Sequence, residues 1–189
     1  MKNPFTPTKF DTDKIQLGFM EEYKRILAPL TYRPISLLEI GVNKGGSILF
    51  WDDYLQNKDS RILGLDLKLP EIETSSRVSL AQCDQNDADG LRGLAELHGP
   101  FDVIIDDASH QLAETRTCFN TLQPFLKPGG YYVIEDWAMG YFATDYPQYQ
   151  GMVEFVTEIV RNAKELNLAA IKIICEKQKS MAFFQKGSR

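Results

Sequence analysis

The chain has 189 residues, of which 43% are hydrophobic and 25% are charged, with a formal net charge of -5. This length can bury a core within one domain without disulfides. The acidic balance and the lack of a basic stripe argue against nucleic acid as a partner. No apolar stretch has membrane-spanning length, and the start, Met1 to Pro4, lacks a signal-peptide core. We therefore expect a cytoplasmic protein with one domain, residues 1–189, that acts on a small molecule and not at a membrane.

Apolar periodicity and turn residues predict alternating helices and strands. Apolar residues at near-helical spacing predict a leading helix within residues 13–30, and residues 1–30 form a candidate acceptor lid. The predicted strands lie at 35–41, 61–66, 77–84, 101–106, 130–134, 170–175 and 181–185. The other predicted helices lie at 47–55, 88–98, 112–126 and 152–166. Residues 137–150 are aromatic and turn-rich, and we expect them to form a second lid loop.

The alternation of these elements predicts the fold class. Near-continuous apolar strands that alternate with helices are typical of a parallel sheet covered on both faces. The last two strands lie close together in the sequence, so we expect them to pair antiparallel. The sequence thus predicts an α/β fold with a doubly wound, mostly parallel, seven-stranded sheet of the Rossmann-like kind.

Carboxylates end two neighbouring apolar runs between residues 101 and 137. Asp106 and Asp107 close the first run, with His110 three residues after Asp107, and Glu135 and Asp136 close the second. The carboxyl ends of neighbouring parallel strands meet at one edge of a sheet. Carboxylate oxygens suit a hard cation such as Mg²⁺, and histidine readily accepts a proton near neutral pH. The pattern predicts a metal site beside a base, with Asp107 and His110 as catalytic residues.

Helix capping is the alternative interpretation of these acids. Asp107 or Ser109 could be the N-cap of the helix that begins near Gln111, and Asp136 could cap a turn. Capping explains any one of these residues, but it does not explain carboxylates at the ends of both strands together with a histidine. We therefore favour a metal or catalytic role.

A glycine loop follows the first predicted strand, from Gly41 to Gly46, and Asp66 ends the next strand. An acid about 20 residues after such a loop is placed to accept hydrogen bonds from ribose hydroxyls. The loop does not match GxGxxG, because Asn43 stands at the second glycine. The pattern favours a nucleoside ligand, and the alternative is a strand-to-helix turn that needs glycine for its own geometry.

The segment Glu39-Ile40-Gly41-Val42-Asn43-Lys44-Gly45-Gly46-Ser47 resembles motif I of class I S-adenosylmethionine-dependent methyltransferases. Asp13-Lys14, Gln82-Cys83-Asp84 and the two acidic segments are similar to the same group. In pattern the chain resembles metal-dependent macrolide sugar O-methyltransferases of the mycinamicin type and cephalosporin hydroxylase-like proteins. The resemblance runs from about residue 11 to the end. The acidic segments are its specific part, whereas motif I indicates only the superfamily.

The resemblance implies a role for each candidate residue. It implies that Asp107, Glu135 and Asp136 hold Mg²⁺ and that His110 is the general base. It also implies a set of residues that bind S-adenosylmethionine. In this set Glu39, Gly41 and Gly45 shape the methionine side, Asp66 holds the ribose, Asp84 lies near the adenine, and Asp106 completes the group.

We expect an enzyme that transfers a methyl group from S-adenosylmethionine to a small-molecule hydroxyl acceptor, a sugar or polyol of a natural product. The alternatives are a catechol-type phenolic O-methyltransferase, a non-catalytic S-adenosylmethionine-binding protein and a nicotinamide-dependent oxidoreductase. Glu39 before the glycine loop and the Glu135-Asp136 pair weigh against the last. The sugar enzymes often carry extra N-terminal structure, and only a short segment precedes the leading helix in this sequence, so we expect that the acceptor does not transfer from the resemblance. A homo-oligomer that completes the acceptor pocket is a further expectation.

Overall fold

A single sheet organises the chain in the computed structural model, which describes residues 10–142, 145 and 147–188. Residues 1–9, 143, 144 and 146 of the two expected lids lie outside the described residues. The sheet has seven strands in the order β3-β2-β1-β4-β5-β7-β6. They are β1 (Ser36–Ile40), β2 (Arg61–Asp66), β3 (Val78–Gln82), β4 (Phe101–Asp106), β5 (Leu126–Glu135), β6 (Leu168–Glu176) and β7 (Lys179–Lys186). The first five strands are parallel, and β7 is antiparallel to both β5 and β6. The predicted sheet is confirmed.

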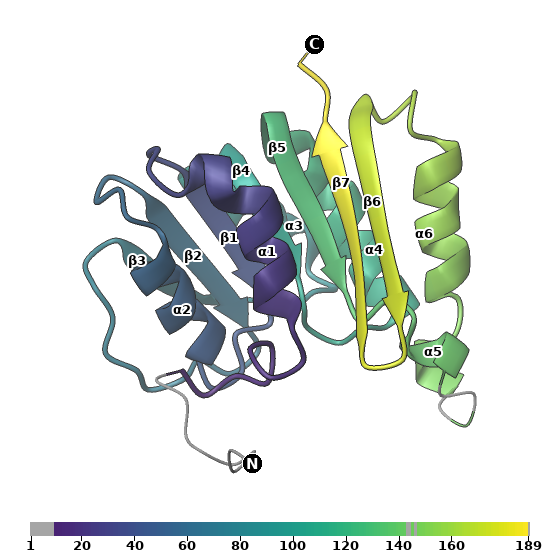
Figure 1. The fold of residues 1–189 in the computed structure, drawn as a ribbon, viewed down its shortest axis with the longest axis horizontal. Coiled ribbons are helices and arrows are strands. Elements are labelled where there is room, and N and C mark those ends of the chain that lie inside the picture. The colour runs from purple at the N-terminus through teal and green to yellow at the C-terminus, as the bar shows by residue number, and fades with distance from the viewer. Residues whose placement is uncertain (1–9, 143–144, 146, 189) are drawn as a thin grey trace.

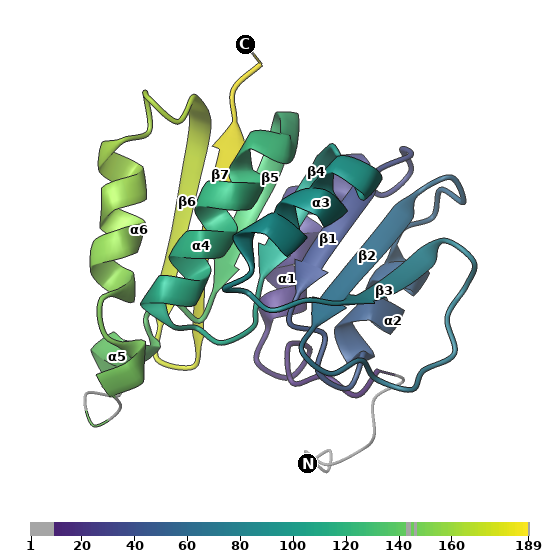
Figure 2. The same cartoon turned by 180° about the vertical axis from the view of Figure 1, so that it is seen from behind.

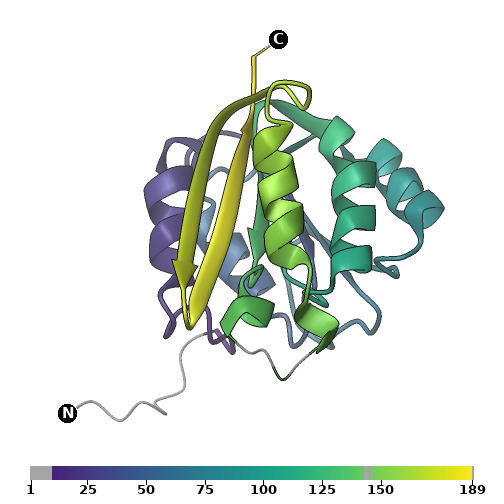
Figure 3. The ribbon, with the colours of Figure 1, turned by 90° about the vertical axis from the view of Figure 1, so that its right-hand side faces the viewer.

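Helices cover both faces of the sheet. In Figure 1, α1 (Phe19–Leu27) and α2 (Gly46–Tyr54) lie in front of it. Figure 2 shows α3 (Ala88–His98), α4 (Leu112–Leu122) and α6 (Met152–Arg161) on the opposite face, and Figure 3 shows the two helical layers on either side of the strands. The short segments are α5 (Met139–Phe142) and the 3₁₀ turns η1 (Ala28–Leu30), η2 (Gln123–Phe125) and η3 (Pro147–Tyr149). None of the described helices has the length and apolar character needed to cross a membrane.

The core is divided by the sheet into two layers. Successive residues of a strand point to opposite faces, so a strand buried on both faces is apolar at every position. In β1, Leu37 packs in the layer that contains Tyr23 and Trp51, whereas Leu38 packs in the layer that contains Leu91 and Phe119. This two-sided burial explains the continuous apolar runs of the sequence.

Four predicted boundaries differ from the structure by four residues or more, and two of these are ends: the helices predicted at 112–126 and 152–166 end at Leu122 and Arg161. The other two are starts. The leading helix begins at Phe19 and not near residue 13, because Gly18 adopts a left-handed φ of 82° that interrupts the helical backbone. Strand β5 begins at Leu126, ahead of the predicted start at 130, because Leu126 already pairs with Phe101 before a register shift in the ladder. The sequence there, Lys127-Pro128-Gly129, has the composition of a turn, so the predicted strand started only after it.

Candidate active site at the carboxyl edge of the sheet

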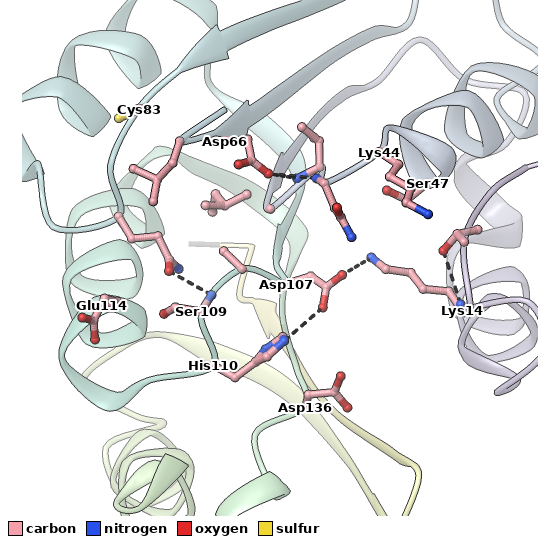
Figure 4. Close-up of a pocket in the computed structure, with 18 of the residues that line it drawn as sticks. Lys14, Lys44, Ser47, Asp66, Cys83, Asp107, Ser109, His110, Glu114 and Asp136 are labelled. Atoms are coloured by element: carbon pink, nitrogen blue, oxygen red, sulfur yellow. Dashed lines mark hydrogen bonds and ion pairs between the residues drawn. The ribbon is translucent and has the colours of Figure 1, made fainter. Parts of the chain in front are cut away.

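A cavity of about 780 Å³ lies at the carboxyl edge of the parallel strands. The chain runs from β1 outward through β2 to β3 and then returns to β4 on the other side of β1, so the strand order reverses between β1 and β4. Ligands of open α/β sheets bind at such a reversal. The loops after β1 to β5 line the cavity, together with residues 11–14 (Figure 4).

Among the described residues, Asp107, His110 and Asp136 form a group of side chains that could together hold a metal ion. One ligand atom from each residue lies within 4.8 Å of the others. Nε2 of His110 is 4.0 Å from Oδ1 of Asp107, and Figure 4 shows Asp136 beside this pair. Two carboxylates and an imidazole therefore converge on one point of the cavity wall.

The backbone at this group is unusual. His110 has a φ of 56° and Asp136 a φ of 51°, both in the left-handed region that residues other than glycine rarely adopt. Strand β7 fixes the second of these turns, because the backbone N–H of Asp136 donates to the carbonyl of Ser180 at 2.7 Å. The Ser180 hydroxyl accepts a further bond from Ala138 N at 3.1 Å. Such backbone geometry is frequent where side chains must be held for function.

Burial, together with the charge of Asp107, raises the pKa of Asp136 to about 6, against the opposing effect of the nearby His110. Burial therefore weakens the solvation of the ionised Asp136 carboxylate, and a bound cation would compensate for this lost solvation.

Glu135 lies in a second, buried cluster. Nζ of Lys14 is 3.0 Å from Oε1 of Glu135, and the hydroxyl of Tyr23 donates to the same oxygen at 2.5 Å. The same ammonium lies 2.7 Å from Oε1 of Glu39 and 2.7 Å from Oδ2 of Asp107. Burial lowers the pKa of Lys14, but the charges of Asp107, Glu135 and Glu39 outweigh it and hold that pKa well above its usual value.

The strand periodicity explains why these acids meet. Side chains two residues apart in a strand point to the same face. Leu37, Ile105 and Val133 all pack in the α1 and α2 layer. The acids two positions later, Glu39, Asp107 and Glu135, therefore turn toward the same side, where Lys14 and Tyr23 lie.

The structure thus groups only two of the three residues predicted to hold the metal with His110. It brings Asp107 and Asp136 together with His110, and it joins Glu135 to Lys14 and Tyr23. Asp107 belongs to both clusters, since Oδ2 contacts Lys14 and Oδ1 is the oxygen nearest to His110.

The glycine loop touches the loop that carries Asp107. Gly41 has a φ of 91°, and a Cβ atom built there would lie 2.1 Å from the carbonyl oxygen of Asp107. Only glycine allows this approach. Asp66 stabilises the same loop, because its Oδ2 accepts from Val42 N at 2.9 Å and from Asn43 N at 2.8 Å. Gly45, with a φ of 84°, stands at the N-cap of α2.

The remaining predicted cofactor residues divide between the cavity and the interior. Asp84 lines the cavity, and its Oδ1 accepts from Asn86 N at 2.8 Å. Glu39 is fully buried and contacts Lys14, and burial raises its pKa although Lys14 opposes the rise. Asp106 is also buried, and its Oδ1 accepts from Gln85 Nε2 at 2.9 Å. Burial, and then the charge of Asp107, raise the pKa of Asp106 to about 8.

The capping interpretation is wrong for Asp107. The N-cap of α4 is Gln111, and no side chain caps this end of the helix. Ser109 contributes only a 3.3 Å bond from Gln111 N to its hydroxyl.

The segment proposed as the second lid is partly folded. Trp137 is buried in the core, whereas Tyr141 and Phe142 of α5 are exposed and contact each other edge to face at 5.0 Å. Among the described residues of 137–150, none lines the cavity. The lid stays a prediction, and residues 11–14 are the described part of the first lid that lines the cavity.

Sequence reasoning missed Tyr23 and Gln85 and noticed Lys14 only through the resemblance. Tyr23 has the helical spacing of core residues with Phe19 and Leu27, so its hydroxyl went unnoticed. A buried tyrosine hydroxyl usually needs a partner, which was the available signal.

A protein-family comparison matches residues 38–137 to a family described as methyltransferase domain. The match begins in β1 and ends just after Asp136, so it contains the glycine loop and the Asp107, His110 and Asp136 group.

Curated relatives share more than a third of their aligned residues with the chain. The 8-demethyl-8-(2-methoxy-alpha-L-rhamnosyl)-tetracenomycin-C 3'-O-methyltransferase of Streptomyces olivaceus is 38% identical over 125 residues, which are 62% of this chain and 32% of the relative. The mycinamicin VI 2''-O-methyltransferase of Micromonospora griseorubida is 37% identical over 131 residues, 66% of this chain and 32% of the relative. The chain thus spans about a third of the length of these relatives.

The structure of MycE methyltransferase from the mycinamycin biosynthetic pathway, in complex with Mg and SAH, is similar in fold. It superposes with a TM-score of 0.75 at 30% identity, over 89% of this chain and 49% of that protein.

Proposed function

The chain belongs to the methyltransferase domain family, and we propose that it is a Mg²⁺-dependent O-methyltransferase that uses S-adenosylmethionine. The proposed acceptor is a hydroxyl group on a sugar or polyol of a natural product. This choice is supported by the relatives, whose names include a rhamnosyl compound and mycinamicin VI.

One observation supports this proposal most strongly. The Asp107, His110 and Asp136 group lies in the same cavity as the glycine loop and Asp66. A candidate nucleoside-binding region and a candidate metal site with a base therefore share one space, as transfer between a cofactor and an acceptor requires.

The donor set fits Mg²⁺. This ion prefers oxygen ligands and usually keeps positions for water or substrate. The oxygens of Asp107 and Asp136 suit it, and the preference for oxygen leaves the imidazole of His110 free to accept a proton. Glu135 is the third proposed ligand. Glu135 does not line the cavity, and its described hydrogen bonds are made to Oε1, so coordination would require Oε2.

The cavity also fits the cofactor. Its volume of about 780 Å³ lies within the range of roughly 300 to 1,000 Å³ found for small-molecule sites. Gly41 and Gly46 line the cavity, and the acids of the cavity suit a cationic sulfonium.

The residues of the chain would then act on the acceptor in the following way. When bound, S-adenosylmethionine supplies an activated methyl group, and Mg²⁺ makes the acceptor hydroxyl more acidic. Asp107 and Asp136 would hold Mg²⁺ next to the acceptor hydroxyl. Nε2 of His110 would accept the hydroxyl proton as the acceptor oxygen takes up the methyl group. Asp107, 4.0 Å from the imidazole, stabilises the positive charge that develops there.

Calorimetry with S-adenosylhomocysteine and with NAD tests the cofactor class. We expect binding of S-adenosylhomocysteine alone, and tight NAD binding without a response to S-adenosylhomocysteine would overturn the proposal. A screen with methyl-labelled cofactor and Mg²⁺ then compares sugar, polyol and catechol acceptors. Label transferred only to catechols would favour the phenolic alternative, and transfer that persists in a chelator would remove the metal from the mechanism.

A further inference from the structure

We infer that Gln85 is a positioning residue for His110, because its side-chain amide ties the loop that carries this histidine to the loop after β3. The function of His110 as a base rests on the proposed function. The contacts of Gln85 do not, and they can be tested separately.

Gln85 follows β3 and lines the cavity next to Asp84, yet only 7% of its surface is exposed. Its Nε2 donates to Oδ1 of Asp106 at 2.9 Å, and its Oε1 accepts from the backbone N–H of Ser109 at 3.1 Å. The bond at Ser109 is drawn in Figure 4. One amide thus connects the end of β4 with the following loop, and only one orientation of that amide satisfies both partners.

Ser109 directly precedes His110, whose φ is 56°. A left-handed residue other than glycine persists only where its surroundings fix it. The bond from Ser109 N to Gln85 fixes the peptide that enters this turn. Without it, the turn can relax toward a more favourable backbone, and the imidazole moves away from Asp107 and Asp136.

A second contact strengthens this connection. The Sγ atom of Cys118, in α4, lies 3.8 Å from the carbonyl oxygen of Gln85. Helix α4 begins immediately after the His110 loop. The loop after β3 therefore contacts both the loop that carries His110, at Ser109, and the helix α4 that follows this loop, at Cys118.

A purely structural role would make Gln85 one buried side chain among many. In that case its loss would lower stability without moving His110 selectively. The two roles are separated by the position of His110, and the chain offers a direct probe of that position because it has only two histidines, His98 and His110.

The experiment compares Gln85→Met with Gln123→Met in the tag-free full chain. Gln123 lies in η2, and its Nε2 donates to Leu166 O at 3.1 Å, so the control removes a glutamine hydrogen bond outside the cavity. Imidazole resonances are measured by NMR without cofactor or metal. We expect Gln85→Met to shift or broaden the His110 signals, with those of His98 unchanged, and Gln123→Met to change neither.

The kinetic measurement uses S-adenosylmethionine, Mg²⁺ and the acceptor found in the screen. We expect Gln85→Met to lower kcat about 10- to 100-fold, the usual range for losing a group that orients an active residue, with little change in the KM for cofactor. If wild-type protein transfers no methyl group, the proposed function fails, while the NMR measurement still decides the role of Gln85.

A donor-acceptor exchange supplies the rescue. In Gln85→Glu combined with Asp106→Asn, the introduced amide can donate to the introduced carboxylate, which still accepts from Ser109 N. We expect this double variant to match Asp106→Asn alone in its His110 signals and kcat, whereas Gln85→Glu alone does not. Should Gln85→Met fail to fold, this comparison decides the question. Unmoved His110 signals in folded Gln85→Met, or a double variant no better than Gln85→Glu, would overturn the inference.

Discussion

Nζ of Lys14 lies 2.7 Å from Oδ2 of Asp107, which joins the segment before α1 to the loop after β4. The other oxygen of Asp107 is the one nearest to His110. Asp107 therefore contacts the buried ammonium of Lys14 with one oxygen and faces His110 with the other. The charge of Lys14 acts on the candidate metal-binding group through this carboxylate.

Lys14→Met should destabilise the protein strongly. It leaves Glu39, Asp107 and Glu135 without their shared cation, and removal of one partner from a buried ion pair typically costs about 3 to 5 kcal/mol. Urea unfolding measures this free energy. Lys24→Met is the control, because Lys24 pairs with Glu21 at the surface and such pairs contribute about 0 to 1 kcal/mol. Equal losses in the two variants would contradict the central role of Lys14.

Gly41→Ala should disturb the site through the backbone. The new Cβ would lie 2.1 Å from the carbonyl oxygen of Asp107 at a φ of 91°, so the loop after β4 must move. We expect lower stability and weaker divalent-ion binding, measured by thermal unfolding and calorimetry. Gly93→Ala in α3 meets no atom within 4 Å, and should instead stabilise the helix by about 0.5 to 1 kcal/mol. A Gly41→Ala protein with normal ion binding would contradict this prediction.

Asp106 should make stability depend on pH. Burial, and then the charge of Asp107, raise its pKa to about 8, whereas aspartate in unfolded chains titrates near about 4. The folded state therefore binds the proton more tightly, and this stabilisation is complete below about pH 4 and is lost as the pH rises through about 8.

Urea unfolding without divalent ions, at several values between about pH 5 and pH 8, measures this effect. Wild-type protein should lose stability relative to Asp106→Asn as the pH rises, by at most about 1.4 kcal/mol per pH unit. The comparison isolates Asp106, because Glu135 and Asp136, whose pKa values are also raised, are present in both proteins. Parallel curves for the two proteins would exclude the effect.

His110→Ala should keep cofactor binding and lose most of the turnover. Loss of a general base typically lowers the rate about 10²- to 10⁴-fold, and in the proposed function the imidazole faces the acceptor. Calorimetry with S-adenosylhomocysteine and single-turnover rates measure the two quantities. His98→Ala, at the far end of α3, is the control, and full activity of His110→Ala would remove the proposed base.

Asp136→Asn should weaken divalent-ion binding, since it replaces one of the two carboxylates that join His110 at the cavity. Calorimetry with Mn²⁺ or Mg²⁺ measures the affinity directly. Asp89→Asn, in the first turn of α3, changes the net charge equally and should bind the ion as wild-type protein does. If both variants bind alike, Asp136 is not a ligand.

Sequence patterns predicted several elements to the residue, namely β2, β4 and α3. Their ends are marked by local chemistry. In α3, for example, Asp87 accepts from Gly90 N at 2.9 Å, and Gly99-Pro100 follows the last turn. The start of α1 could not be predicted in the same way, since apolar spacing continues through the turns before Gly18.

The site could be predicted in position but not in its partners. Acids at the ends of neighbouring strands placed Asp107 and Asp136 in one cavity. The face of the sheet toward which Glu135 points depends on its position in the alternation of β5. Its partner, Lys14, lies 121 positions away in the chain, so the sequence around Glu135 does not identify it. Long-range pairing of this kind leaves no local pattern.

The bond from Asp136 N to Ser180 O also concerns how this site could be moved to another scaffold. The segment that matches the family, residues 38–137, contains Asp107, His110 and Asp136 but neither Ser180 nor Lys14 and Tyr23. A graft with those limits would contain the candidate metal-binding group. It would lack Ser180, which bonds to the backbone of Asp136, and Lys14, which contacts the side chain of Asp107. The smallest transferable unit therefore extends from the turn before α1 to the final hairpin.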